Sequence, residues 1–316
     1  MSDFTPPIAP EVAAEAPATK AGPSNLRLRV IWGVLGAALL LGSVWFSPWT
    51  FGLFFAAVQA IMLWEFYRMM RAGGYAPATW IGVGASLLLF GGTLWVVFHD
   101  LAPAVNESNG FAALFDGALA IVNIELLWRG LAILLPVVLL VREMTVWPRY
   151  AQPFSNAATA VFGLMYISVP MALLNVIAFG NRGYDYRRVF ALLFLIWASD
   201  IGAYAAGKTF GKHKMAPSIS PGKTWEGWAG GFLLTLLVGW ALGYLLPDLP
   251  LTHRLVAAGV VAVFAPLGDL AESMLKRSVG VKDSGSIMPG HGGLLDRFDA
   301  FLLVLPVLAL LQLLAG

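Results

Sequence analysis

The sequence predicts an all-α integral membrane protein, a polytopic helical bundle with about nine transmembrane helices. Hydrophobic residues make up 59% of the 316 residues and charged residues only 12%, whereas a soluble globular protein carries about 25% charged residues. Apolar runs long enough to cross a hydrocarbon core of roughly 30 Å recur along the whole chain. Strict alternation of apolar and polar residues is absent, which favours helices over a membrane barrel.

Three regions follow from the distribution of these runs. Residues 1–25 are rich in proline and alanine and contain no apolar run, so we expect a disordered N-terminal tail. Basic residues precede the first span, which favours a cytoplasmic N-terminus. We divide the rest into N-terminal transmembrane helices, 26–187, and a C-terminal membrane region, 188–316, to which the motifs below assign catalysis.

The predicted spans cover, approximately, residues 30–49, 51–67, 80–98, one span within 111–141, 157–179, 189–206, 228–246, 255–267 and 300–315. Region 111–141 fits either one span or two short ones, and we take one because every later loop then falls on a consistent side. This count places a basic loop, 207–227, and a polar stretch, 268–299, on the cytoplasmic face. At the end of the second span, we expect Glu65 and Arg68 to form an interfacial ion pair.

The composition also excludes some kinds of site. The chain has no cysteine, so it holds neither a disulfide nor a thiolate metal site. Its four histidines include no close pair, which argues against a histidine-rich zinc site. We expect no nucleic-acid partner.

The polar stretch carries the chemistry. Five carboxylates, four basic residues and a histidine lie within residues 268–299, beside membrane helices where polar groups are costly without a use. Helical spacing places Asp269, Ser273 and Lys276 on one face, and Asp296 and Asp299 on another. Carboxylate oxygens are ligands that Mg²⁺ prefers, and the glycines of segment 289–293 let backbone amides approach a phosphate. The stretch therefore predicts a metal and phosphate site at the membrane surface.

The preceding segment offers two further candidates. Asp200, near the end of a predicted span, is a functional candidate because carboxylates are rare in membrane helices. Residues 202–209 match the P-loop pattern, but we reject a P-loop because no strand precedes them. The lysines of the basic loop can grip phosphates or contact anionic headgroups. Of these, Lys223 follows a predicted turn at Pro221 and Gly222, so we expect it to join the site of the polar stretch.

The polar stretch resembles the signature of phosphatidate cytidylyltransferases, also called CDP-diacylglycerol synthases. The resemblance rests on Ser273–Arg277, Lys282–Gly285 and Pro289–Asp299, and it extends to segments 199–200 and 220–227. Met288 departs from the leucine, isoleucine or phenylalanine usual in that family, and it conserves volume. The specific match covers residues 195–300, whereas the first half is similar only as a multi-span pattern.

The resemblance implies an enzyme of phospholipid biosynthesis, a nucleotidyltransferase that transfers CMP from CTP to phosphatidic acid. The products are CDP-diacylglycerol and pyrophosphate, formed by metal-assisted in-line attack on the α-phosphorus. The expected cofactor is Mg²⁺, with a second cation left open, and the expected location is the inner (plasma) membrane, with the N-terminus and site loops cytoplasmic. Expected partners are CTP, phosphatidic acid and the bilayer, and a homodimer is left open.

On that chemistry we assign the residues in three sets. The metal-ligand set is Asp269, Asp296 and Asp299. The catalytic set adds Ser273, Lys276, Arg277, Lys282, Asp283, His291 and Arg297. The substrate-binding set is Asp200, Ser220, Lys223, Gly292 and Gly293.

Two other functions fit parts of the pattern. A CTP-dependent lipid kinase, or a cytidylyltransferase for another lipid, shares the nucleotide and differs in the acceptor or in the group transferred. An anion transporter explains the spans, but transporters keep their site near the bilayer midplane between repeated halves. Here the polar residues gather at one face and no repeat is evident, which favours the enzyme.

Overall fold

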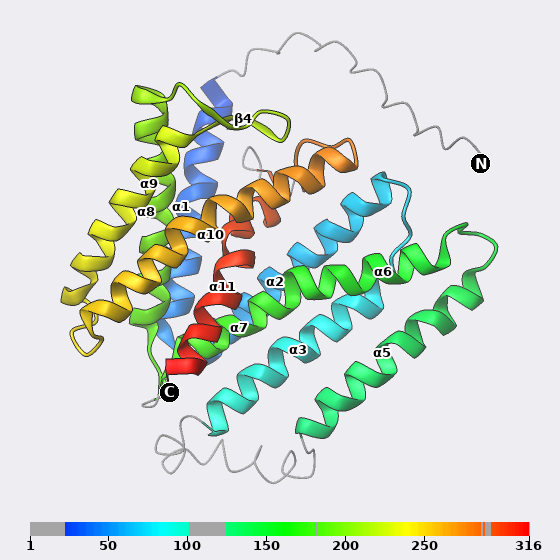
Figure 1. Cartoon of the computed structure of the whole chain (residues 1–316). Coiled ribbons are helices and arrows are strands. Elements are labelled where there is room, and N and C mark those ends of the chain that lie inside the picture. Colours follow the sequence, from blue (N-terminus) through cyan, green and yellow to red (C-terminus); the bar gives the residue numbers. More distant parts are fainter. Residues whose placement is uncertain (1–22, 101–123, 181–182, 286, 288–291, 316) are drawn as a thin grey trace, which may run out of the picture.

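The computed structural model describes residues 23–100, 124–180, 183–285, 287 and 292–315, which form a bundle of long helices (Figure 1). Among these residues, seven helices are long and apolar enough to cross a membrane. They are α2 (Pro48–Ala72), α3 (Thr79–Asp100), the rod of α6 (Pro153–Gly163), η2 (Leu164–Ser168) and α7 (Val169–Ala178), α8 (Tyr186–Phe210), α9 (Trp225–Ala241) with η3 (Leu242–Tyr244), α10 (Leu251–Ser278) and α11 (Leu295–Ala315).

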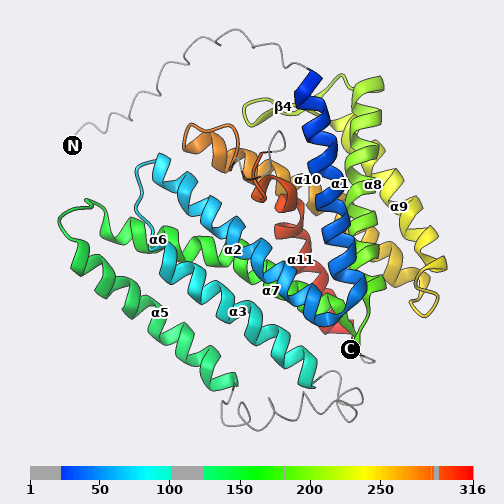
Figure 2. The same cartoon turned by 180° about the vertical axis from the view of Figure 1, so that it is seen from behind.

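Two more helices, α1 (Pro23–Phe46) and α5 (Ile124–Val146), bring the described helical rods to the predicted number. The prediction of a polytopic helical membrane protein is therefore confirmed. Helix α1 packs against α2 and α8, as Figure 2 shows from behind. It begins at Pro23, within the predicted tail, whose residues 1–22 lie outside the described part. In the ambiguous region, the structure describes one helix, α5, and residues 111–123 lie outside the described part.

Helix α10 is longer than predicted. Hydropathy predicts a span that ends near Leu267, but the helix continues into the polar stretch and ends at Ser278. Pro266 lies inside it and lacks the N–H that would bond the Ala262 carbonyl, and the Trp228 indole N–H donates to that carbonyl instead, at 3.2 Å. The polar stretch therefore begins on a rigid helix rather than on a loop.

The described part contains two short hairpins, in loops between spans. One pairs β1 (Phe179–Gly180) with β2 (Gly183–Tyr184), and the other pairs β3 (Lys214–Ala216) with β4 (Ser220–Thr224). The turn predicted at Pro221 and Gly222 is wrong, because these residues lie in β4 and the hairpin reverses at residues 217–219. Thr224 then caps α9, since its hydroxyl accepts the Gly227 amide at 3.2 Å.

Helix α8 begins after Asp185, whose carboxylate accepts the Arg187 amide at 3.0 Å. Burial alone would raise the pKa of Asp185, but the hydrogen bonds from Arg187 outweigh it and hold that pKa below its usual value. An ionised carboxylate at a helix N-terminus is stabilising. The helix covers residues 202–209, which confirms the rejection of a P-loop there.

Glycines allow the helices around the polar stretch to approach closely. A Cβ on Gly268 of α10 would lie 2.5 Å from the carbonyl oxygen of Asp299 on α11, so only glycine fits this crossing. Helices α8 and α9 pack side by side in the same way, with Gly202 against the Gly230 carbonyl. The crossing at Gly268 brings Asp269 next to Asp299.

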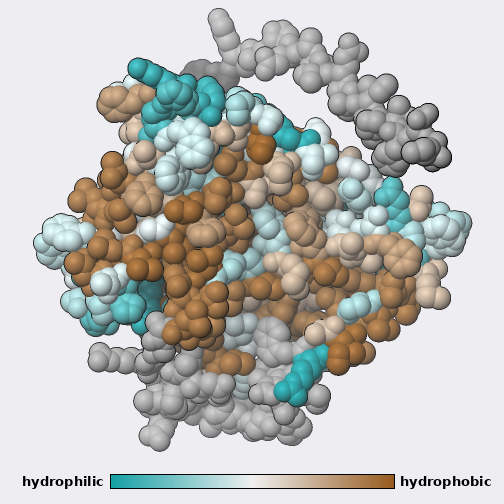
Figure 3. Space-filling model, in the orientation of Figure 1, coloured by the Kyte–Doolittle hydropathy of each residue, from teal (hydrophilic) through white to brown (hydrophobic). Residues whose placement is uncertain are grey.

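The surface divides as a membrane protein requires. Hydrophobic residues cover most of the face in Figure 3, and hydrophilic residues gather over the β3–β4 hairpin. In both cartoon views, the hairpin lies at the same end of the bundle as the C-terminal end of α10 (Figures 1 and 2). The polar stretch and the basic loop therefore share one end of the molecule.

Candidate active site

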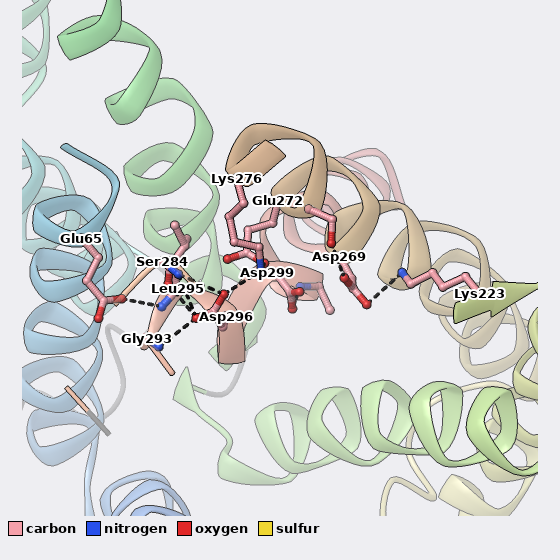
Figure 4. Close-up of polar contacts among 12 residues, drawn as sticks. Glu65, Lys223, Asp269, Glu272, Lys276, Ser284, Gly293, Leu295, Asp296 and Asp299 are labelled. Atoms are coloured by element: carbon pink, nitrogen blue, oxygen red, sulfur yellow. Dashed lines mark hydrogen bonds and ion pairs between the residues drawn. The ribbon is translucent and has the colours of Figure 1, made fainter. Parts of the chain in front are cut away.

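Three carboxylates form the centre of the site. Asp269 and Glu272 on α10 and Asp299 on α11 each offer one oxygen, and these oxygens all lie within 4.8 Å of one another. Figure 4 shows the three side chains together where the two helices cross. Glu272 is 1% exposed, and its Oε1 is buried without a hydrogen-bond partner among the residues that the structure describes. Such an oxygen is costly to bury unless a ligand satisfies it.

Two lysines approach these carboxylates from opposite sides. Lys276 Nζ donates to Glu272 Oε2 at 2.7 Å and to Asp296 Oδ1 at 2.7 Å. Lys223 Nζ lies 2.8 Å from Asp269 Oδ2 and donates to the Pro266 carbonyl at 2.9 Å. Lys223 belongs to β4, so the hairpin of the basic loop and the polar stretch meet at this point (Figure 4).

Asp296 organises the segment before α11. Its Oδ2 accepts hydrogen bonds from the Ser284 hydroxyl at 2.9 Å and the Gly293 amide at 2.8 Å. Its Oδ1 accepts from Lys276. Both oxygens are therefore occupied by protein donors, and Asp296 lies outside the group of three carboxylates, which contains Glu272 instead. The assignment of Asp296 as a metal ligand stays a prediction.

Comparison with known proteins identifies the family of this chain. Residues 27–314 match the sequence model of the cytidylyltransferase family. The chain belongs to the cytidylyltransferase family. It is similar to phosphatidate cytidylyltransferase of Bacillus subtilis (strain 168), with 34% identity over 287 residues that cover 90% of this chain and 96% of the relative.

Two further relatives carry the same name. The protein of Haemophilus influenzae is 32% identical over 287 residues, covering 86% of this chain and 93% of the relative. That of Staphylococcus aureus (strain COL) is 38% identical over 173 residues, covering 54% and 65%. These matches confirm the family inferred from the signature and the prediction that the chain is a nucleotidyltransferase.

In this cytidylyltransferase, Glu65 of α2 helps to position the site, although the sequence predicted only an interfacial ion pair with Arg68. Glu65 is fully buried, and its Oε2 accepts the Leu295 amide at 2.9 Å, so it caps the start of α11 rather than lying in an interfacial pair. Arg68 instead lies over the Trp64 ring. A Cβ on Gly293 would lie 2.7 Å from Glu65 Oε2, so this contact also requires the glycine.

Some of the other predicted residues lie at or near this centre. The Ser273 hydroxyl donates to Asp269 Oδ1 at 3.2 Å. Asp200 on α8 lies close enough to Asp269 and Lys223 to interact with their charges. Gly292 has a φ of 81°, a conformation that glycine adopts at little cost.

Other predicted residues differ in exposure. Four charged side chains of the polar stretch are exposed: Arg277, Lys282, Asp283 and Arg297. Ser220, the first residue of β4, is half-buried. His291 lies outside the described residues.

Proposed function

We propose that this membrane protein transfers CMP from CTP to phosphatidic acid, giving CDP-diacylglycerol and pyrophosphate. The observation that carries the proposal is the group of three carboxylates flanked by two lysines at one end of the bundle. Phosphatidate cytidylyltransferase is also the name of the relatives that cover most of this chain.

The reaction needs little covalent chemistry from the protein. An oxygen of the lipid phosphate forms a bond to the α-phosphorus of CTP, and the bond from that phosphorus to the bridging oxygen breaks to release pyrophosphate. The lipid phosphate is anionic at neutral pH, so no general base is required. The protein must align the two substrates and offset their negative charge.

The carboxylates fit a hard divalent cation. Mg²⁺ takes oxygen ligands and is commonly held by one or two carboxylates together with substrate phosphates. We propose that Asp269, Glu272 and Asp299 hold it, with the orphaned Glu272 Oε1 as one ligand atom. When bound, the cation supplies positive charge beside the transferring phosphoryl group and the leaving pyrophosphate. In this proposal Asp296 fixes the 284–293 segment, and a second cation remains open.

The lysines provide the fixed positive charge. Lys223 lies beside Asp269 and Lys276 beside Glu272, so both ammonium groups border the place where we expect the substrate phosphates. A phosphate that enters the site can accept hydrogen bonds from them, because an ammonium group has three N–H donors. Arg277 and Lys282 are exposed, and there they can attract CTP or the lipid headgroup.

The location follows from the substrates. We propose that the end of the bundle that carries the β3–β4 hairpin faces the cytoplasm, where CTP is available, and that the protein resides in the inner (plasma) membrane. Seven described helices are long and apolar enough to cross a membrane, and this end of the bundle lies at the ends of those helices (Figure 1), so the lipid phosphate and the nucleotide can meet there. The homodimer stays a prediction.

CTP labelled on different phosphorus atoms tests the function directly. Purified protein receives phosphatidic acid, Mg²⁺ and CTP labelled on either the α- or the γ-phosphorus, and the label in the lipid phase is counted. Transfer of CMP places the α-label in lipid and leaves the γ-label in water-soluble pyrophosphate. A lipid phase that takes up the γ-label instead identifies a CTP-dependent kinase and overturns the proposal.

A further inference from the structure

Tyr166 brings an unused hydrogen-bond donor next to the three carboxylates. It lies in η2, a single π-helical turn that joins α6 to α7 in one continuous rod. Its hydroxyl is buried and has no hydrogen-bond partner among the residues that the structure describes. The carboxylates of Glu272, Asp299 and Asp269 all lie within electrostatic range of that hydroxyl.

The surroundings of the ring hold the hydroxyl in place. The ring stacks on Phe162, with centroids 5.6 Å apart, and packs near Phe66, with centroids 6.4 Å apart. These contacts hold the ring in place, while the hydroxyl at its end has no hydrogen-bond partner among the described residues. A π turn inserts one extra residue into a helix and shifts the side chains that follow, and such turns are frequent at functional sites.

An unsatisfied buried hydroxyl is costly, so its presence needs an explanation. A neighbouring tyrosine shows the usual solution, because Tyr67 on α2 donates its hydroxyl proton to the Ala160 carbonyl at 2.7 Å. Tyr166 makes no such bond to the residues that the structure describes, although three carboxylates lie within electrostatic range. A tyrosine hydroxyl is protonated at neutral pH, so the group is an O–H donor.

We propose that Tyr166 is a catalytic residue that donates a hydrogen bond to a phosphate oxygen of a bound substrate. This inference rests on the proposed function, since it needs a phosphate beside the three carboxylates. Phosphate oxygens occur in both CTP and phosphatidic acid, and the kinetics below separate these two sources. The bond is charge-assisted, which makes it stronger than a bond between neutral groups.

The test is Tyr166→Phe, which removes one oxygen and keeps the ring. Because the hydroxyl makes no hydrogen bond to any residue in the described part of the chain, the variant should unfold at the same temperature as wild type or higher. Its kcat/KM should fall by roughly tenfold or more. A raised KM for CTP assigns the bond to the nucleotide, a raised KM for phosphatidic acid assigns it to the lipid, and a lowered kcat alone assigns it to the transition state.

Tyr67→Phe is the matched control. It removes a hydroxyl that does bond the protein, so it should lower the unfolding temperature and leave kcat/KM near wild type. If Tyr166→Phe keeps wild-type kcat and KM for both substrates, or loses activity only in proportion to lost folded protein, the assignment of Tyr166 is wrong. Absence of CMP transfer by the wild-type protein would instead overturn the proposed function itself.

Discussion

Replacement of Lys223 by alanine tests whether the hairpin belongs to the active site. The side chain is 21% exposed and makes two short contacts, at 2.8 Å to the Asp269 carboxylate and at 2.9 Å to the Pro266 carbonyl. Its removal leaves Asp269 close to Glu272 and Asp299 with one fewer positive charge nearby. CTP, which is strongly anionic, then enters a more repulsive site.

The size of the effect follows from the hydrogen bond that Lys223 offers to a substrate phosphate. A hydrogen bond to a charged group contributes about 1.5–3 kcal/mol. The Asp269 side chain beside Lys223 is 44% exposed, so solvent screens the interaction and the lower end of this range applies. We therefore expect Lys223→Ala to raise the KM for CTP or lower kcat by about tenfold, which corresponds to about 1.4 kcal/mol.

The control comes from the same hairpin. Lys214 on β3 is exposed and pairs with Thr224 through the backbone, so Lys214→Ala leaves the hairpin intact and should change kcat/KM by less than about twofold. Both variants are assayed as purified proteins with CTP and phosphatidic acid varied in turn. If Lys223→Ala matches wild type for both substrates, the hairpin is a surface that contacts headgroups and the site belongs to α10 and α11 alone.

Two further predictions concern Asp296 and the topology. Asp296→Asn weakens the bond to Lys276 and the contacts that hold the 284–293 segment, so it should lower the unfolding temperature and reduce kcat about a hundredfold or more. The Mg²⁺ concentration for half-maximal residual activity should stay unchanged. A shift in that concentration would instead identify Asp296 as a metal ligand. The chain has no cysteine, so single cysteines at exposed positions report sidedness. Cysteines at Ser218 and Ser278 should both be shielded from an impermeant thiol reagent in intact cells, and one at Thr252, at the other end of α10, should react; labelling of Ser218 and Ser278 from opposite sides would separate the hairpin from the site.

The sequence predicts the membrane helices well because apolar length alone decides them. Hydropathy locates the spans, but it ends the eighth near Leu267 since the following residues are polar. The backbone hydrogen bonds of α10 continue regardless, to Ser278, and Pro266 does not end the helix. Boundaries inside polar helical segments therefore cannot be read from hydropathy.

The sequence predicts the part of the site in which the residues lie close together along one helix. Spacing along α10 placed Asp269, Ser273 and Lys276 on one face, and the same rule could have added Glu272, which lies three residues from Asp269 and four from Lys276. Glu65 has no such local signal, because it meets Leu295 at a separation of 230 positions. Tyr166 depends in the same way on how the α6–α7 rod packs against α2. Only the tertiary structure brings these side chains to the site.

The most direct test of the central claim is CMP transfer by Asp299→Asn. Asp299 Oδ1 accepts the Ala300 amide at 2.7 Å, a bond that the asparagine oxygen can keep, so the variant loses one negative charge with little change in the fold. With α-labelled CTP, phosphatidic acid and Mg²⁺, we expect wild type to label the lipid, EDTA to abolish and Mg²⁺ to restore that labelling, and folded Asp299→Asn to lose at least about a hundredfold in kcat. Wild-type labelling rates in Asp299→Asn, or labelling that persists in EDTA, would contradict a reaction carried by a cation on these three carboxylates.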